Sequence, residues 1–458
     1  MKGALKWSAT LAVILLTGGC AKTLDYVELR DDQKVARLMK LADERSFGEG
    51  EIVTRLSDPS TQVRRQAALA LGRIGTPEAA GPLAAALGDP QPSVRSAAAF
   101  ALGLLEGPLP AETLEVLRGR LADPNPEVAG QATRALSRKD SEEAAEAITT
   151  ALLDRLPSGA PPYVWGEDLE RSAQRLPHAD LRLGLFALAR LSSVRWAWSV
   201  LATEETQPRF LWWPAAWTTA RLAAPELAQL LLHYAGSNDP YLRLMGTQGL
   251  ARLSPDVSRR AVLHLLEDPD EKVRIAAVQA AAALRLQESV PRLLELMDRD
   301  SSYVQVEAIK ALASFPDPGV VEPLIDRLSD PRAWIRAAAL RSLAHQDPES
   351  FWLLLSGLDP DPVWSVRAAL ARLLGELEDR RSVALLRNLA EQGDVRVRPH
   401  ALRALAQASP QTAVPILVEH LVAEDPFERA AAAEELGRLR PEGGVEPLLK
   451  AFQAARRV

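Results

Sequence analysis

One stretch decides the fold, and it reads Asp330-Pro331-Arg332-Ala333-Trp334-Ile335-Arg336-Ala337-Ala338-Ala339-Leu340-Arg341-Ser342-Leu343. Its skeleton is Asp-Pro, a short polar loop, an apolar residue followed by Arg, and then an alanine-rich run. The skeleton recurs with a spacing of 31 residues, and its other close copies begin at Asp58, Asp89, Asp268 and Asp361. Looser copies begin at Asp123, Asp239, Asp300, Asp394 and Asp425. A fixed period in this range predicts an array of structural repeats.

Each repeat is expected to be a hairpin of two helices. Asp favours the N-cap of a helix and Pro its first turn, so Asp-Pro predicts the start of the first helix. The apolar residues that follow fall at helical spacing, for example Val63, Ala67, Ala70, Leu71 and Ile74. Their small side chains allow close packing, and prolines such as Pro323 and Pro415 indicate where a second helix begins. Because such hairpins bury their apolar faces only by stacking, the expected fold is all-α, a right-handed α-solenoid.

The Asp-Pro-x-x-x-Val-Arg motif and the Val-x-Pro-Leu helix starts resemble those of the HEAT-like repeat family, particularly its short form named after phycobilisome lyases. The resemblance covers roughly residues 45–140 and 222–458. It implies that the loop Asp and the Arg six residues later hydrogen-bond within and between repeats, which forms a structural ladder along the solenoid. The ladder residues are Asp58 and Arg64, Asp89 and Arg95, Asp268 and Arg274, Asp330 and Arg336, and Asp361 and Arg367. Ala129 and Gln305 replace the Arg in two copies, so the ladder is expected to be broken there.

The chain is expected to divide into five segments. Residues 1–19 are interpreted as a lipoprotein signal peptide, and residues 20–50 as a lipid anchor with an N-terminal capping segment. Regular repeats fill residues 51–140 and 222–458, with a cap at the C-terminus, and residues 141–221 form degenerate, Trp-rich repeats with a Pro-rich loop. A single Cys excludes an intramolecular disulfide, so stability is expected to come from the helical stack alone.

The first residues are typical of a bacterial export signal. Lys2 and Lys6 flank the start of a largely apolar run of about ten residues, which is too short to span a bilayer. The run ends at Leu16-Thr17-Gly18-Gly19-Cys20, which is similar to the lipobox of bacterial lipoproteins, where a Cys is diacylated. Thr17 departs from the preferred Leu, and the alternative is an ordinary secretory signal. Cys20 is the predicted lipidation site, and the following Ala21 favours the periplasmic face of the outer membrane under the enterobacterial sorting rule.

The region from 141 to 221 also contains six of the ten tryptophans. They are Trp165, Trp196, Trp198, Trp212, Trp213 and Trp217. One interpretation, the favoured one, is core packing where alanine-rich repeats have been lost. The other is an exposed patch that binds a protein, because Trp is frequent among interface hot spots. Solvent accessibility distinguishes the two interpretations.

Catalytic and metal-binding motifs are missing from the sequence. The six histidines form no His-x-x-x-His or Glu-x-x-His pair, so no metal site is expected. There is no nucleophile elbow, phosphate-binding loop or dinucleotide fingerprint. A net charge of −6 without a basic stripe argues against a nucleic-acid partner. We therefore expect no enzyme activity, no cofactor and no small-molecule substrate.

Three functional classes remain. The preferred one is a lipid-anchored scaffold of the bacterial cell envelope, bound to the membrane through acylated Cys20, whose solenoid surface binds a protein or peptide. The second is a structural or assembly factor of an envelope complex without a ligand cleft. The third is an enzyme related to the bilin lyases or DNA glycosylases with HEAT-like repeats, which export, acidity and the missing catalytic residues disfavour.

Overall fold

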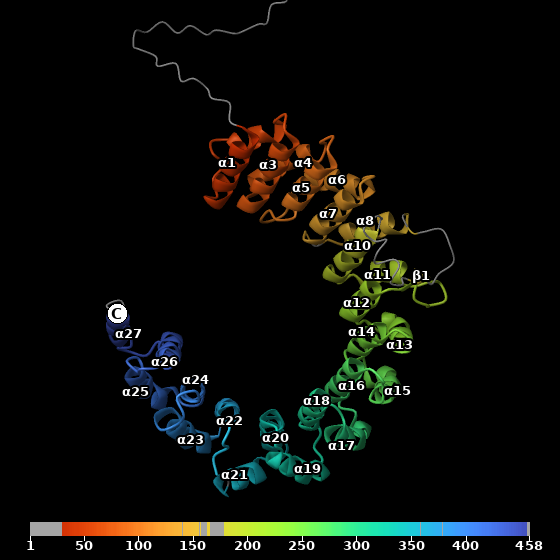
Figure 1. Ribbon diagram of the computed structural model, residues 1–458. Helices are drawn as coiled ribbons and strands as arrows, with labels where there is room; N and C mark the ends of the chain where they lie inside the picture. Colours follow the sequence, from red (N-terminus) through yellow and green to blue (C-terminus); the bar gives the residue numbers. More distant parts are fainter. Residues whose placement is uncertain are drawn as a thin grey trace, which may run out of the picture. The chain divides into compact units, whose positions relative to one another are not determined.

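The structure is a computed structural model that describes residues 30–139, 141–154, 156, 163–164, 178–357, 359–377 and 379–455. Cys20 and Trp165 lie outside these residues. The described chain is almost entirely helical (Figure 1), which confirms the expected all-α solenoid. It divides into two compact parts, the N-terminal unit (residues 1–120) and the C-terminal unit (residues 121–458). Within the described ranges, every helix is too short or too polar to span a lipid bilayer.

The N-terminal unit is a short two-layer stack. Its helices are α1 (Asp31–Asp43), α2 (Glu51–Thr54), α3 (Thr61–Ile74), α4 (Ala80–Ala86), α5 (Pro92–Leu102) and α6 (Ala111–Gly119). Helices α1, α3 and α5 pack side by side in a first layer, and α4 and α6 pack together in a second layer. The described part of the predicted capping segment is therefore helix α1, which closes the first layer.

The C-terminal unit repeats the same two-layer arrangement. Its first layer contains α7 (Pro126–Ser137), α10 (His178–Arg190), α12 (Trp213–Leu222), α14 (Pro240–Leu250), α16 (Glu271–Ala283), α18 (Ser302–Leu312), α20 (Ala333–Gln346), α22 (Trp364–Glu376), α24 (Arg398–Ala408) and α26 (Pro426–Leu439). Its second layer contains α8 (Glu142–Leu153), α11 (Val194–Leu201), α13 (Ala228–Ala235), α15 (Pro255–Leu265), α17 (Val290–Arg299), α19 (Val321–Asp326), α21 (Pro348–Gly357), α23 (Arg380–Glu391), α25 (Pro410–His420) and α27 (Val445–Ala455). Each first-layer helix packs against the next one along the chain (Figure 1).

Alanine and glycine determine how closely the first-layer helices approach. Ala276, Ala277 and Ala280 of α16 are buried among their neighbours. A Cβ atom added at Gly375 of α22 would lie 2.8 Å from the Cβ atom of Ala404 in α24. The small residues that mark the repeat in the sequence therefore lie where two helices meet.

The apolar core of the C-terminal unit contains two clusters that meet at α20. Ile335 and Ala338 of this helix belong to the cluster that begins at Ala220. Leu343 and Ala344 of the same helix belong to a second cluster that extends to Leu436. Helix α19 also contributes to both, because Leu324 belongs to the first cluster while Val321 and Ile325 pack against the second.

The repeated Asp is not the N-cap that the sequence predicts. Asp58 lies three residues before the start of α3, and the N-cap of α3 is Ser60. The Asp58 carboxylate instead accepts a hydrogen bond from the Ser60 N–H at 3.0 Å. Asp89, Asp268, Asp330 and Asp361 make the same turn. The Asp therefore shapes the loop before the helix, and this position leaves its carboxylate open to a second partner.

Two looser copies of the motif are shifted relative to the others. Asp239 and Asp425 are true N-caps, whose carboxylates accept hydrogen bonds from the first turns of α14 and α26. The carbonyl oxygens that accept from the repeat Arg belong to Ser237 in one copy and Ala423 in the other. The sequence alignment of these two copies on Asp-Pro is therefore wrong by two residues.

The described residues between 141 and 221 continue the helical stack. Helices α8, α10, α11 and α12 belong to this part of the stack and pack against one another. The described residues also form a two-stranded parallel sheet, in which β1 (Tyr163–Val164) pairs with β2 (Phe210–Leu211).

Candidate interaction surfaces

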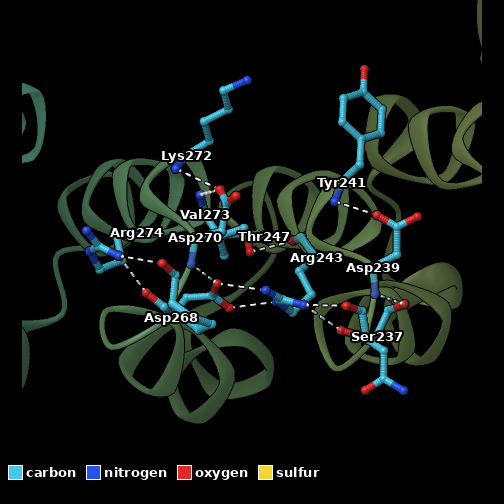
Figure 2. Close-up of polar contacts among 12 residues, drawn as sticks. Ser237, Asp239, Tyr241, Arg243, Thr247, Asp268, Asp270, Lys272, Val273 and Arg274 are labelled. Atoms are coloured by element: carbon cyan, nitrogen blue, oxygen red, sulfur yellow. Dashed lines mark hydrogen bonds and ion pairs between the residues drawn. The ribbon is translucent and has the colours of Figure 1, made fainter.

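The repeat Arg joins its own loop to the next repeat. Arg243 donates from Nε and Nη2 to the carboxylate of Asp268 at 2.7 and 2.9 Å, and from Nη1 to the Ser237 carbonyl oxygen at 3.0 Å (Figure 2). Arg274 contacts the Asp300 carboxylate and the Asp268 carbonyl oxygen in the same way. Each Asp thus binds one Arg through its side chain and another through its main chain.

The other ladder residues follow this geometry with one change from the expected pairing. Arg64 pairs with Asp89, Arg336 with Asp361 and Arg367 with Asp394, so the carboxylate partner always belongs to the next repeat. The Asp six residues before each Arg contributes only its carbonyl oxygen, as Asp89 does to Arg95 at 2.9 Å. Asp58 pairs with Lys34 of α1 at 3.1 Å, which extends the ladder into the first helix.

These ion pairs are largely shielded from solvent and keep the carboxylates ionised. The side chains of Arg243 and Asp268 are 14% and 4% exposed. Burial by itself raises the pKa of Asp268, but hydrogen bonds from Arg243 and the Asp270 N–H outweigh it and lower the pKa overall. For Asp361, the hydrogen bond from Arg336 is the largest influence, and it also lowers the pKa. Charge-assisted bonds of this kind contribute about 1.5–3 kcal/mol each.

The expected break at Gln305 is bridged. The Gln305 side chain donates to the Asp298 carbonyl oxygen at 3.1 Å and accepts from Arg332 Nη1 at 2.7 Å. Arg332 also holds the Asp330 carboxylate with two bonds of 2.8 and 2.9 Å. An arginine from the following loop therefore replaces the missing one, and the prediction of a break at Gln305 is wrong. Ala129 is buried in α7 and has no polar side chain with which to form a rung.

The five described tryptophans of residues 141–221 are neither fully buried nor gathered in one patch. Trp213 and Trp217 pack on Phe186 of α10, with ring centroids 5.9 and 4.9 Å apart. Trp196 lies beside α8, where its carbonyl oxygen accepts a hydrogen bond from Thr149, and its ring contacts the Arg195 guanidinium. Trp217 is the most exposed at 36%. Trp196, Trp198, Trp212 and Trp213 are half-buried.

The most exposed aromatic rings of the first layer lie in the regular repeats instead. The exposed fraction is 76% for Tyr303, 72% for Phe427, 56% for Trp334 and 50% for Tyr241. Each of these residues is the second residue of its helix and lies two residues before the ladder Arg or its replacement. We call them the aromatic row. Trp334 lies in the stretch that decides the fold, so the shared register was a signal that the sequence analysis missed.

In the other repeats from α14 to α26, the same position is polar. It is occupied by Lys272 in α16, Ser365 in α22 and Arg396 just before α24. Tyr241 and Lys272, from adjacent repeats, point away from the ladder to the same side (Figure 2). The position therefore presents one side chain per repeat along one edge of the first layer.

A cavity of about 690 Å³ lies beside the second core cluster, which supplies Leu328, Leu370 and Leu374 to its walls. Its walls come from α20, α21, α22 and α23 and are mainly aliphatic, with Leu340, Leu355, Leu370 and Leu389 among them. The ladder pair of Arg336 and Asp361 lines one side. In the part of the chain that the structure describes, no three His, Cys, Asp or Glu side chains gather closely enough to hold a metal ion.

Two layers of stacked helical hairpins, joined by repeated Asp–Arg rungs, define an α-solenoid repeat protein. The family model for HEAT repeats matches the chain in six places, over residues 51–136, 82–158, 224–305, 299–350, 353–437 and 392–457. These matches span more than half of the sequence, and the chain belongs to the HEAT repeat family. This fold is typical of protein-interaction scaffolds, which use extended surfaces of this kind.

Several solved structures are similar to the chain at low identity. An engineered protein is 20% identical, with 85% of this chain and 98% of that chain covered and a TM-score of 0.32. A homology model of the full-length AP-3 complex in an intermediate open conformation is 12% identical, with 93% and 100% covered and a TM-score of 0.38. The X-ray structure of YibA from Escherichia coli is 13% identical, with 69% and 99% covered and a TM-score of 0.38. A comparison with curated proteins finds no match.

Proposed function

We propose that the protein is a membrane-tethered interaction scaffold whose aromatic row binds an extended polypeptide. The observation that carries the proposal is the shared register of Tyr241, Tyr303, Trp334 and Phe427, which places large exposed rings at the same position of four repeats, two of them consecutive. Exposed rings lose water-accessible apolar surface only when a partner covers them, and aromatic residues are enriched at protein interfaces.

The spacing of the row favours a polyproline II conformation in the partner. Packed helices lie about 8–10 Å apart, so one row side chain follows another at about that distance. A polyproline II helix advances about 3.1 Å per residue and has three residues per turn, so every third side chain returns to one face after about 9 Å. Aromatic surfaces bind proline-rich segments of this shape. Tyr303 and Trp334, in consecutive repeats, form the centre of the proposed contact.

The proposed tether is the acylated Cys20, and the sequence before it supports this assignment. One acyl chain binds membranes only marginally, whereas two or more anchor a protein stably. The variant Cys20→Ser is expected to leave the membrane fraction on cell fractionation, and mass spectrometry should find lipid on the N-terminal fragment of the wild type only. A variant that stays in the membrane fraction, together with a wild-type fragment that carries no lipid, contradicts the tether.

The binding test uses a defined peptide rather than a cell extract. An uncharged peptide with proline at every third position is titrated into the wild type and into the double variant Tyr303→Ala/Trp334→Ala by calorimetry. Loss of two central rings should weaken binding by at least about 2 kcal/mol, the usual cost at an interface hot spot. Leu353→Ala is the matched control, because Leu353 is 75% exposed but lies in the second layer.

The result of this titration distinguishes a polypeptide-binding scaffold from a structural or assembly factor. Equal binding of a glycine-serine peptide, or unchanged affinity in the double variant, contradicts the aromatic row as the binding surface. The protein is then better explained as a structural or assembly factor that holds an envelope complex without a ligand surface of its own.

A further inference from the structure

A polar pocket of about 490 Å³ lies on the first layer between α22, α24 and α26. Arg372, Arg403 and Arg438 line it together with His400 and Gln407. Its two carboxylates already have partners, because Glu376 binds Arg341 with two bonds and Glu435 binds Arg438 at 2.7 Å. The pocket therefore has more positive charge than its own carboxylates neutralise.

The repeat register identifies what is missing from the pocket. Arg341, Arg372 and Arg403 occupy equivalent positions in three consecutive repeats. Arg341 pairs with Glu376, and Arg403 pairs with Glu434 at 2.8 Å. For Arg372, the residue equivalent to Glu376 is Gln407, and the residue equivalent to Glu434 is Arg403. The repeat that follows Arg372 therefore has neither of the carboxylates with which Arg341 and Arg403 pair.

His400 lies within this uncompensated charge. It is half-buried in α24 and lines the pocket with Arg372, Glu376, Arg403, Glu435 and Arg438. Burial lowers the pKa of His400, and the positive charges of Arg372 and Arg403 lower it further. A negative charge in the pocket would offset both arginines, so the ring would then hold its proton at higher pH.

We propose that this pocket binds an oxyanion, namely the carboxylate of an acidic side chain on the bound polypeptide, which takes the place of the missing glutamate beside Arg372. Arginine donors in this arrangement match the planar shape of a carboxylate. The partner is thus a polypeptide that combines a proline-containing polyproline II segment with an acidic residue.

The pocket lies on the same helix face as the aromatic row. Arg372 is seven residues after Ser365, the row position of α22. Seven residues make almost two helical turns and advance about 10 Å along the axis, so a single extended chain reaches both surfaces. The identity of the ligand in this inference rests on the proposed function, whereas the excess positive charge of the pocket is independent of it.

The test measures anion binding without any peptide. Protein with isotope-labelled histidine side chains is titrated with glutarate and, separately, with inorganic phosphate at constant ionic strength. The NMR signal of the His400 ring is followed in each titration. The signal is assigned with His400→Asn. In the wild type, glutarate should shift the signal saturably and raise the His400 pKa, and binding should strengthen as the pH falls through that pKa.

Two variants test the assignment. Arg372→Gln removes the unpaired cation, and Gln407→Glu supplies the missing carboxylate from within the chain. Each should weaken glutarate binding at least tenfold, because one loses the donor and the other fills the site. Arg259→Gln is the control, since Arg259 is an exposed arginine of α15 paired with Glu288. Equal thermal melting of the variants and wild type shows that folding is intact.

Each result has a definite meaning. Saturable glutarate binding that both variants abolish supports the inference. Saturation by phosphate alone overturns the carboxylate assignment, and an unsaturable response or an insensitive Arg372→Gln variant overturns the site. Because the aromatic row is tested with an uncharged peptide, failure of one experiment does not decide the other.

Discussion

A single residue type, the repeat arginine, makes the contacts that fix one loop against the next. The guanidinium has donors on two edges, so it bonds a carboxylate with one edge and main-chain carbonyl oxygens with the other. The motif predicts that Asp and Arg cooperate, but not that the carboxylate belongs to the next repeat. That assignment depends on how two repeats stack, because Asp268 and Arg274 lie in one repeat while Arg274 bonds Asp300 of another. The spacing of Asp and Arg in the sequence does not indicate which repeat supplies the carboxylate.

Arg336→Ala should lower the free energy of unfolding by roughly 1–3 kcal/mol, because it leaves the Asp361 carboxylate largely shielded and unpaired. Chemical denaturation measures the loss. The control Arg387→Ala removes an exposed arginine paired with Glu391 within α23, and it should cost about 0.5 kcal/mol or less.

Acid provides a second check on the same pair. Arg336 lowers the pKa of Asp361, so the stabilisation is present above the unfolded pKa of about 3.9 and is lost as the pH falls through the lower folded value. The difference between Arg336→Ala and wild type should therefore shrink in acid. A loss of stability that stays constant down to pH 2 would show that the residue acts through packing alone.

At the scale of helices, small residues set the distance between neighbours. Gly375→Ala places a methyl group 2.8 Å from the Ala404 Cβ atom and 2.9 Å from its Cα atom, so α22 and α24 must move apart. Overpacking of this kind costs about 1–3 kcal/mol and should lower the melting temperature. Gly437→Ala in α26 is the matched control, because a Cβ atom there meets nothing within 4 Å. The control should be neutral or stabilise by up to about 1 kcal/mol, since alanine favours helix. Equal effects of the two substitutions would contradict the close approach.

The helices themselves were predictable because period, alanine content and proline positions agree. The residues at which the helices begin were less predictable. Asp-Pro predicts a helix at Pro59, yet α3 begins at Thr61, because the Asp58 carboxylate bonds the Ser60 N–H and forms a turn first. The exposed rings of the regular repeats were not predicted. Tryptophans gather in residues 141–221 of the sequence, but the exposure of Tyr303 and Trp334 depends on where each residue falls on its helix.

For the molecule as a whole, the sequence predicts the repeat solenoid, whereas the proposed partner is inferred from the chemistry of the exposed surfaces. The proposed surfaces all lie in the C-terminal unit, where ladder pairs follow one another from Arg243 to Asp394. A continuous set of rungs keeps row side chains at a regular spacing, which an extended partner requires. Regular architecture and specific binding are linked in this way, because the same register that places each arginine also places each exposed ring.

The cavity between α20 and α23 has a consequence for cooperativity. In a linear array each repeat is coupled only to its neighbours, so the weakest junction decides where the stack separates first. Side chains that line a void lack packing partners on one side, and this void lies between the hairpin of α20 and α21 and the hairpin of α22 and α23. Repeats after residue 357 are therefore expected to open as a separate block, and amide hydrogen exchange should give them a lower opening free energy than α14 to α18. The junction between α21 and α22 would then be the place beyond which the last repeats unfold and refold while the earlier ones remain folded.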